Sequence, residues 1–222
     1  MGYQFDFTVI WKSWPLLLEG ALNTMYYTVV SILIAMVLGT LVMLGRKSKV
    51  AVIRILSRVF IESLRNTPFL VQLFFVYFGL PSLGIKLSIE TAAIAALSLN
   101  TAAYIAEVVR GGVDALPKGQ IEAGRALGLN GRQIFFDVVL KPSLRAVYPG
   151  LCSQFILLLL MTSIVSSISA PDLTYQALFI ESRYFRSFEA FFTVTAIYLF
   201  LSVTLSSLLR VIGRFYFSYP TR

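Results

Sequence analysis

The sequence predicts an all-α membrane protein with five transmembrane helices, and three observations support this fold class. Of the 222 residues, 57% are hydrophobic and only 14% are charged, whereas about 25% of the residues in a typical soluble domain are charged. The mean hydropathy is +0.78. The apolar residues also gather in runs of about 20, which is the length that an α-helix needs to cross the hydrocarbon core of a bilayer.

Five segments meet this length requirement, and we expect each of them to be one transmembrane helix. They cover residues 20–44, 67–84, 88–109, 144–168 and 189–212. The first ends at Arg46-Lys47, and the second is short and contains Pro81. We therefore expect one transmembrane domain over residues 1–222, with a polar loop over residues 111–142.

The segment between the first two spans, residues 51–65, has a different pattern. Arg54, Arg58 and Arg65 recur at helical spacing among apolar residues such as Leu56 and Val59. This spacing predicts an amphipathic helix, and its large apolar content favours a place at the membrane surface over that of a solvated connector.

The distribution of basic residues predicts the orientation. Fifteen of the 19 Lys and Arg residues lie within 46–65, within 110–145 or after residue 209, and the other four are Lys12, Lys86, Arg183 and Arg186. Cytoplasmic loops carry the excess of Lys and Arg. We therefore expect the N-terminus outside, the C-terminus in the cytoplasm and the polar loop on the cytoplasmic side.

The polar loop contains the signals of two short helices. Pro117 suits the first turn of a helix, and Gly128 suits its end, where the left-handed conformation favours glycine. Asn130 followed by Gln133 is the pattern of a capping box that starts a second helix. The apolar face of that helix consists of Ile134, Phe135, Val138 and Val139.

Within this loop, "EAGRALGLNGRQIFFDVVL" resembles the EAA loop of the permease subunits of ABC importers. That motif reads Glu-Ala-Ala, three residues, Gly, nine residues, Ile, one residue, Leu-Pro. Glu122, Ala123 and Gly128 match it, whereas Gly124 replaces the second Ala and the proline comes one residue late, at Pro142. The segments "LRNTPFLVQLFFVYFGLP" and "ALSLNTAAYIAEVVRGGVDALPKGQ" further resemble the polar amino-acid branch of these permeases, which carries His, Glu, Gln, Arg and opines.

This resemblance implies a set of partners for the chain in the bacterial plasma (inner) membrane. They are two cytoplasmic ABC ATPase subunits, a second permease subunit that is either the same chain or a homologue, an extracytoplasmic solute-binding protein and the membrane lipid. The resemblance also implies that the EAA loop is a coupling helix that docks the ATPase. The docking residues are Glu122, Ala123, Gly124, Ala126, Leu127 and Gly128. On spacing alone, a solvated helix without a partner explains this loop equally well.

Polar residues inside the spans predict a substrate path. A mid-membrane amide such as Asn100 needs partners, and such groups usually face a bundle interior or a cavity. Hydroxyl groups also serve as packing contacts between membrane helices, and this alternative stays open. The candidate path residues are Asn100, Thr101, Met161, Thr162, Ser163 and Ser166. Met161 is included because relatives often carry Asp or Asn at this position of "LLLMTS". Glu107 is expected to pair with Arg110 or Arg125 near the interface.

The composition argues against an enzyme. The chain has no His and one Cys, so the commonest general base and metal ligand is missing. No G-x-x-x-x-G-K-[ST] phosphate-binding loop is present, so ATP hydrolysis is expected in another chain. We expect no catalytic residue, metal, cofactor or bound nucleic acid. The alternative function is an autonomous channel or an ion-coupled secondary transporter of small polar solutes, which more often carries an ionisable relay inside the membrane.

Overall fold

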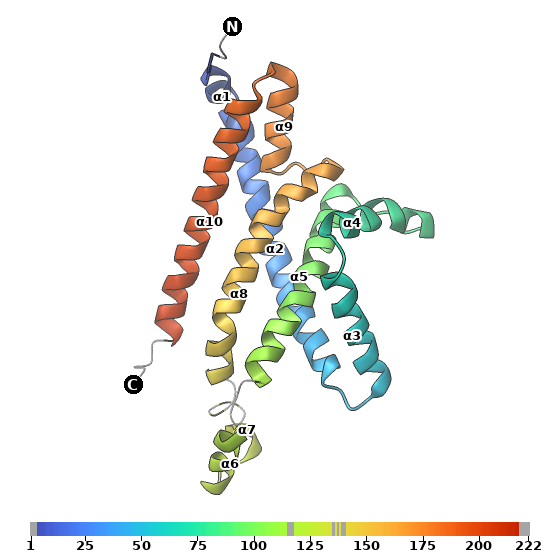
Figure 1. The fold of residues 1–222 in the computed structure, drawn as a ribbon, viewed down its shortest axis with the longest axis vertical. Coiled ribbons are helices and arrows are strands. Elements are labelled where there is room, and N and C mark those ends of the chain that lie inside the picture. Colours follow the sequence, from blue (N-terminus) through green and yellow to red (C-terminus); the bar gives the residue numbers. More distant parts are fainter. Residues whose placement is uncertain (1–3, 115–117, 135, 137, 139–140, 218–222) are drawn as a thin grey trace.

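The computed structural model describes residues 4–114, 118–134, 136, 138 and 141–217. Within these ranges the regular elements are helices, and no strand is present. Figure 1 shows a bundle of long helices, with the N-terminus at one end and a small helical hairpin at the other.

Four helices in the described ranges are long and apolar enough to cross a membrane. They are α2 (Trp14–Arg46), α5 (Ile89–Asp114), α8 (Lys141–Met161) with its 3₁₀ continuation η4 (Thr162–Ile168), and α10 (Ser187–Phe217). They coincide with the expected spans over 20–44, 88–109, 144–168 and 189–212. Each helix is longer than its apolar run, because hydropathy marks only the part of a helix that matches the lipid.

The segment expected to be one helix over 67–84 is instead three short ones. These are α4 (Phe69–Phe74), the π-helix η1 (Phe75–Gly79) and the 3₁₀-helix η2 (Leu80–Leu83). Pro68 precedes the first of them, and a proline disfavours the helical conformation of the residue before it. A fifth span is therefore reached only if the helices before and after Pro68 form one bent span, with an angle of 112° between them.

The helix before this bend is α3 (Ala51–Arg65), and it confirms the amphipathic helix expected over these residues. Ile61 is its only buried residue, whereas Val52, Ile55 and Leu56 are exposed. Figure 1 shows α3 returning along α2 and α5 instead of lying across the end of the bundle, as a helix flat on the membrane surface would. Its exposed apolar side chains therefore face outward along the side of the bundle.

The centre of the bundle is the contact between α2 and α5. Alanines such as Ala102 are fully buried along α5. A Cβ added at Gly39 of α2 would lie 2.8 Å from the carbonyl oxygen of Ala102 and 2.8 Å from Cγ2 of Ile105. Small residues let membrane helices approach this closely. As a result, α2, α3 and α8 pack around α5.

The end of the bundle near the N-terminus is closed by α1 (Thr8–Lys12) and α9 (Leu173–Tyr184). Asp172 caps α9, since its carboxylate accepts hydrogen bonds from the backbone N–H groups of Tyr175 and Thr174 at 2.9 and 3.2 Å. It also accepts the hydroxyl of Tyr198 on α10 at 2.9 Å. Asn23 of α2 donates its side-chain amide to the carbonyl of Pro171 at 2.8 Å, which fixes the turn before α9.

Candidate functional site

A polar cavity of about 320 Å³ lies between the start of α4, the middle of α5 and the second half of α8. Of the candidate path residues, Asn100, Thr101 and Met161 line it. The other lining residues are Thr67, Pro68, Phe69, Tyr104, Gln154, Leu157 and Leu158. The structure therefore brings together half of the residues that the sequence singled out, at a point where three helices meet.

Asn100 is 4% exposed and is connected to the break between α3 and α4. Its side-chain amide donates a hydrogen bond to Oε1 of Gln72 at 2.9 Å. The amide nitrogen of Gln72 in turn donates to the carbonyl of Leu64 at 2.8 Å and to the hydroxyl of Thr67 at 2.8 Å. Asn100 thus has the partner that a buried amide requires, and this partner holds the bent helix pair against α5.

Thr162, Ser163 and Ser166 do not line the cavity. Their hydroxyls donate to backbone carbonyls three residues earlier on the same helix, at 2.7 Å in each case. Such bonds accompany the change from α-helix to 3₁₀-helix at residue 162. The hydroxyls of these three side chains therefore stabilise the local helix. This agrees better with a structural role than with a role in the substrate path.

Two polar residues of the cavity, Tyr104 and Gln154, were missing from the expected path. Their spacing could have revealed them. Tyr104 follows Asn100 by four residues, and Gln154 precedes Met161 by seven, so each lies on the same helix face as its neighbour. The chain positions of Thr67 and Gln72 gave no such signal, because only the bend at Pro68 brings them to α5.

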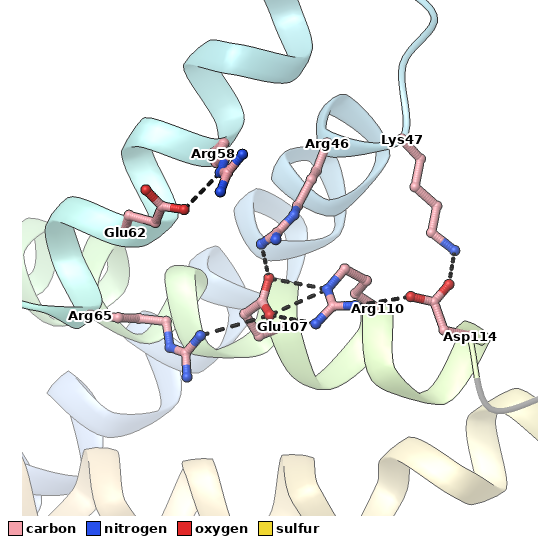
Figure 2. Close-up of polar contacts among 8 residues, drawn as sticks. All are labelled: Arg46, Lys47, Arg58, Glu62, Arg65, Glu107, Arg110 and Asp114. Atoms are coloured by element: carbon pink, nitrogen blue, oxygen red, sulfur yellow. Dashed lines mark hydrogen bonds and ion pairs between the residues drawn. The ribbon is translucent and has the colours of Figure 1, made fainter.

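Glu107 is the centre of an ion-pair network at the end of α5 (Figure 2). It pairs with Arg46 of α2, with Arg65 of α3 at 3.7 Å and with Arg110 of its own helix at 2.8 Å. Its side chain is 15% exposed. The expected partner Arg110 is confirmed, and the other two arginines come from helices far away in the sequence.

The same network continues to the last turn of α5. Asp114 pairs with Lys47 at 2.7 Å and with Arg110 at 3.0 Å. Figure 2 shows that Arg110 points between the two carboxylates and joins them. The network therefore fastens the ends of α2, α3 and α5 at the point from which the chain continues into the polar loop.

The polar loop forms a helical hairpin below the bundle (Figure 1). Its first helix is α6 (Lys118–Ala126), and the short α7 (Gly131–Gln133) follows. Gly128 has φ +74°, the left-handed conformation expected for it. Asn130 and Gln133 form the expected capping box. Pro117, Phe135 and Val139, which belong to the same expectation, lie outside the described residues.

Five of the six expected docking residues are on the outer surface of this hairpin. Glu122, Ala123, Ala126, Leu127 and Gly128 are exposed, and Leu127 is 79% exposed. Gly124 is buried, and a Cβ added there would lie 3.3 Å from Cγ1 of Ile134. Gly124 thus lies where the two arms of the hairpin pack together, and the alanine of the motif would require Ile134 to shift by a few tenths of an ångström.

A helical membrane domain with a polar cavity between its spans, and with an exposed hairpin at one end, defines the membrane-spanning subunit of a transporter. Residues 31–217 match the family described as the inner membrane component of binding-protein-dependent transport systems. The chain belongs to this family. It is a permease subunit of an ATP-driven importer and a multi-pass protein of the bacterial inner membrane, and ATP hydrolysis belongs to a separate chain.

The relatives cover most of the chain. The glutamine transport system permease protein of Escherichia coli K12 is 38% identical over 213 residues, which is 95% of this chain and 97% of the relative. A probable glutamine ABC transporter permease protein of Bacillus subtilis 168 is 39% identical over 165 residues, which is 74% of this chain and 76% of the relative. These matches support a permease and not the alternative of an autonomous channel.

Solved structures show the same fold. A chain from the crystal structure of an amino acid ABC transporter with histidines superposes with a TM-score of 0.89 at 34% identity, covering 96% of this chain and 99% of that one. A chain of the methionine ABC transporter MetNI in an inward-facing form superposes with a TM-score of 0.74 at 23% identity, over 93% of this chain and 99% of that one.

Proposed function

We propose that this chain forms half of the translocation path for a polar amino acid or an opine, and that it docks a cytoplasmic ATPase through residues 119–142. The cavity around Asn100 carries the first part of this proposal, because it places amide and hydroxyl groups inside an apolar bundle. Relatives that are named for glutamine and amino-acid transport support the substrate class.

The lining of the cavity narrows the expected substrate. Every described residue that lines it is uncharged, and Asn100, Thr101 and Gln154 offer hydrogen bonds without a formal charge. A side chain with a net charge would lose its hydration here without an ion partner. We therefore favour a solute with a neutral polar side chain, such as an amide, over an acidic or a basic amino acid.

Substitutions in the cavity test this substrate class. We expect Asn100→Leu to lower ATP-driven uptake at least tenfold in liposomes that contain the complete transporter. Met161→Asp should shift uptake toward basic amino acids, because it places a carboxylate in the cavity. Ser167→Ala is the control, since the hydroxyl of Ser167 donates to the backbone carbonyl of Ile164 and the residue does not line the cavity. Unchanged uptake of a full amino-acid panel by Met161→Asp contradicts the proposal.

The exposed surface of the hairpin supports docking. Leu127 is a large apolar side chain almost fully open to solvent, and such side chains often mark a protein interface. Leu127→Ala should weaken co-purification of the ATPase about tenfold. Gly128→Leu should weaken it further, since it adds bulk and strains a left-handed residue. Gly131→Ala is the control, because a Cβ there meets no atom within 4 Å. Normal attachment of the ATPase to Gly128→Leu contradicts the docking assignment.

The assembly and its orientation complete the proposal. A second permease subunit, identical or homologous, would complete the path, two ATPases would bind inside and a solute-binding protein would deliver substrate outside. The hairpin and the N-terminus lie at opposite ends of the bundle (Figure 1), which supports a cytoplasmic hairpin and an external N-terminus. Labelling single cysteines in a Cys152→Ser background with a membrane-impermeant reagent tests this. A cysteine at position 132 should react only after the cells are broken open, and a reaction in intact cells contradicts this orientation.

A further inference from the structure

A second large cavity lies on the flank of the bundle, apart from the polar cavity around Asn100 and from the hairpin. It has a volume of about 600 Å³ and lies between residues 145–156 of α8 and residues 206–214 of α10. Three arginines line it, Arg145 of α8 and Arg210 and Arg214 of α10. Apolar and small residues such as Ile156 and Leu209 line it as well. None of these residues lines the polar cavity around Asn100 or belongs to the hairpin.

The two helices arrange this groove with charge at one end. The hydroxyl of Tyr148 donates to the carbonyl of Leu209 at 2.6 Å, and a Cβ at Gly213 would lie 2.5 Å from Cε1 of Tyr148. Because α8 and α10 run in opposite directions (Figure 1), this contact places Arg145 level with the end of α10. Ile156 and Ser206 lie farther along, toward the middle of the bundle. The groove therefore has a cationic mouth and a mostly apolar interior.

The charges at the mouth have no acidic partner in the part of the chain that the structure describes. Among the described residues, none of the three arginines takes part in a salt bridge. Arg210 donates within its own helix, to the carbonyl of Ser206 at 3.4 Å and to the hydroxyl of Ser207 at 3.3 Å. Arg210 and Arg214 are four residues apart and so project from one face. Adjacent like charges favour a bound anion.

The surroundings indicate what kind of anion this is. Helix α10 carries exposed apolar side chains along its length, among them Phe200, Val203 and Val211. Such side chains suit contact with hydrocarbon chains, so a groove bordered by α10 is accessible to lipid. Basic pockets between transmembrane helices on the cytoplasmic side bind the headgroups of anionic lipids. A free phosphate would satisfy the arginines but not the apolar interior.

We propose that this groove is a binding site for one anionic phospholipid of the cytoplasmic leaflet. Its phosphate contacts Arg145, Arg210 and Arg214, and one acyl chain lies along Ile156 toward the middle of the bilayer. The leaflet rests on the orientation proposed above, whereas the chemistry of the groove does not. A lipid here holds α8, which begins directly after the coupling loop, against α10.

Lipid retention by the purified transporter tests the site. Native mass spectrometry of the complete complex is recorded during titration with dioleoylphosphatidylglycerol, with dioleoylphosphatidylcholine or with inorganic phosphate. We expect the wild type to retain one phosphatidylglycerol per permease chain at least tenfold more tightly than phosphatidylcholine. Arg210→Ala/Arg214→Ala should weaken this about thirtyfold, the effect of two basic residues at an anionic surface.

Two further variants separate this site from general charge attraction. Lys49→Ala/Arg54→Ala removes two exposed charges at the end of the bundle where α2 meets α3, and it should leave retention within twofold of wild type. Ser153→Trp fills the groove while keeping all three arginines, and it should also abolish tight retention. Equal loss in both charge variants overturns the proposal. So does displacement of phosphatidylglycerol by an equal concentration of inorganic phosphate. None of these measurements depends on uptake or on ATPase docking, so the lipid site and the transport function can fail separately.

Discussion

Glu107 and Asp172 lie toward opposite ends of the bundle and are held by opposite kinds of partner. Glu107 remains partly exposed and pairs with three arginines from three helices. Asp172 is fully buried, and it accepts two backbone N–H groups and the Tyr198 hydroxyl. In the described part of the chain, no cation pairs with Asp172.

The difference has physical consequences for each end. Ion pairs near solvent act in a high effective dielectric, are screened by salt and are individually weak. Hydrogen bonds to a buried carboxylate are directional, and their loss leaves unsatisfied groups in an apolar site. The Glu107 end, which leads into the docking hairpin, can therefore exchange partners at low cost. The Asp172 end is fixed in one geometry.

The largest expected effect is that of Asp172→Ala. It removes the cap of α9, which typically contributes about 1 kcal/mol, and it takes the carboxylate from Tyr198, which adds about 1–2 kcal/mol for a buried hydroxyl. We expect a loss of about 2–3 kcal/mol in the free energy of unfolding, measured by far-UV circular dichroism of the transporter in detergent.

Asp172→Asn is the matched control for this loss. Asn is as good an N-cap as Asp, and its amide can donate to the oxygen of Tyr198 in place of accepting from it. We expect Asn to recover more than half of the stability that Ala loses. If Asn and Ala were equally destabilised, the charge of Asp172 would matter more than its hydrogen bonds, and the contrast between the two ends would disappear.

Glu107→Ala should have a smaller effect, about 1–2 kcal/mol, because solvent screens the three arginines that it leaves behind. This loss should shrink in 1 M salt, where the Debye length falls to about 3 Å. Glu62→Ala is the control: Glu62 forms an exposed ion pair with Arg58 on α3 (Figure 2), so its loss should stay below about 0.5 kcal/mol. A loss at Glu107 that does not change with salt would mean that its ion pairs are as far removed from solvent as Asp172 is.

The two ends also differ in how far the sequence predicts them. The pairing of Glu107 with Arg110 follows from their spacing of three residues on one helix, and the Asn130 capping box is local in the same way. Arg46 and Arg65 reach Glu107 only through the packing of α2 and α3 on α5. Hydropathy predicted the straight spans because each is a continuous apolar run.

The bent pair of helices and the polar cavity were harder to predict, because they also depend on how distant segments pack together. Apolar content over 67–84 satisfies the criterion for a span, but it does not show that Pro68 turns the chain by 112°. The bend then decides the neighbours of Asn100, since it places Gln72 and Thr67 against α5. Sequence reasoning therefore found the side of the cavity formed by α5 and α8, and it missed the side formed by the bend.

The stability of the Asp172 end should also depend on pH. Burial raises the pKa of Asp172 from 3.8 to about 6, against the opposing effect of its hydrogen-bond donors. The folded chain therefore binds this proton more tightly than the unfolded chain does, so the stability that protonation adds is present at pH 4 and is lost as the pH rises through about 6. Asp172→Asn cannot titrate. The melting temperature of the wild type minus that of Asp172→Asn should accordingly fall between pH 4 and pH 7, and a rise over this range contradicts the raised pKa.

Among the three arginines around Glu107, Arg65 should have the smallest effect when replaced, and Arg65→Ala tests whether these cations are interchangeable. Arg65 is the most distant of the three, at 3.7 Å from Glu107, and its side chain is 41% exposed. Its guanidinium also lies 5.4 Å from the ring centroid of Tyr104, a contact worth about 0.5–1 kcal/mol at an exposed site. We expect a loss below about 1 kcal/mol, because Glu107 keeps Arg46 and Arg110. Arg110→Ala should cost more, since it separates Glu107 from Asp114. Equal losses in the two variants would show that the network acts as one unit, and the partners at this end would then be as fixed as those of Asp172.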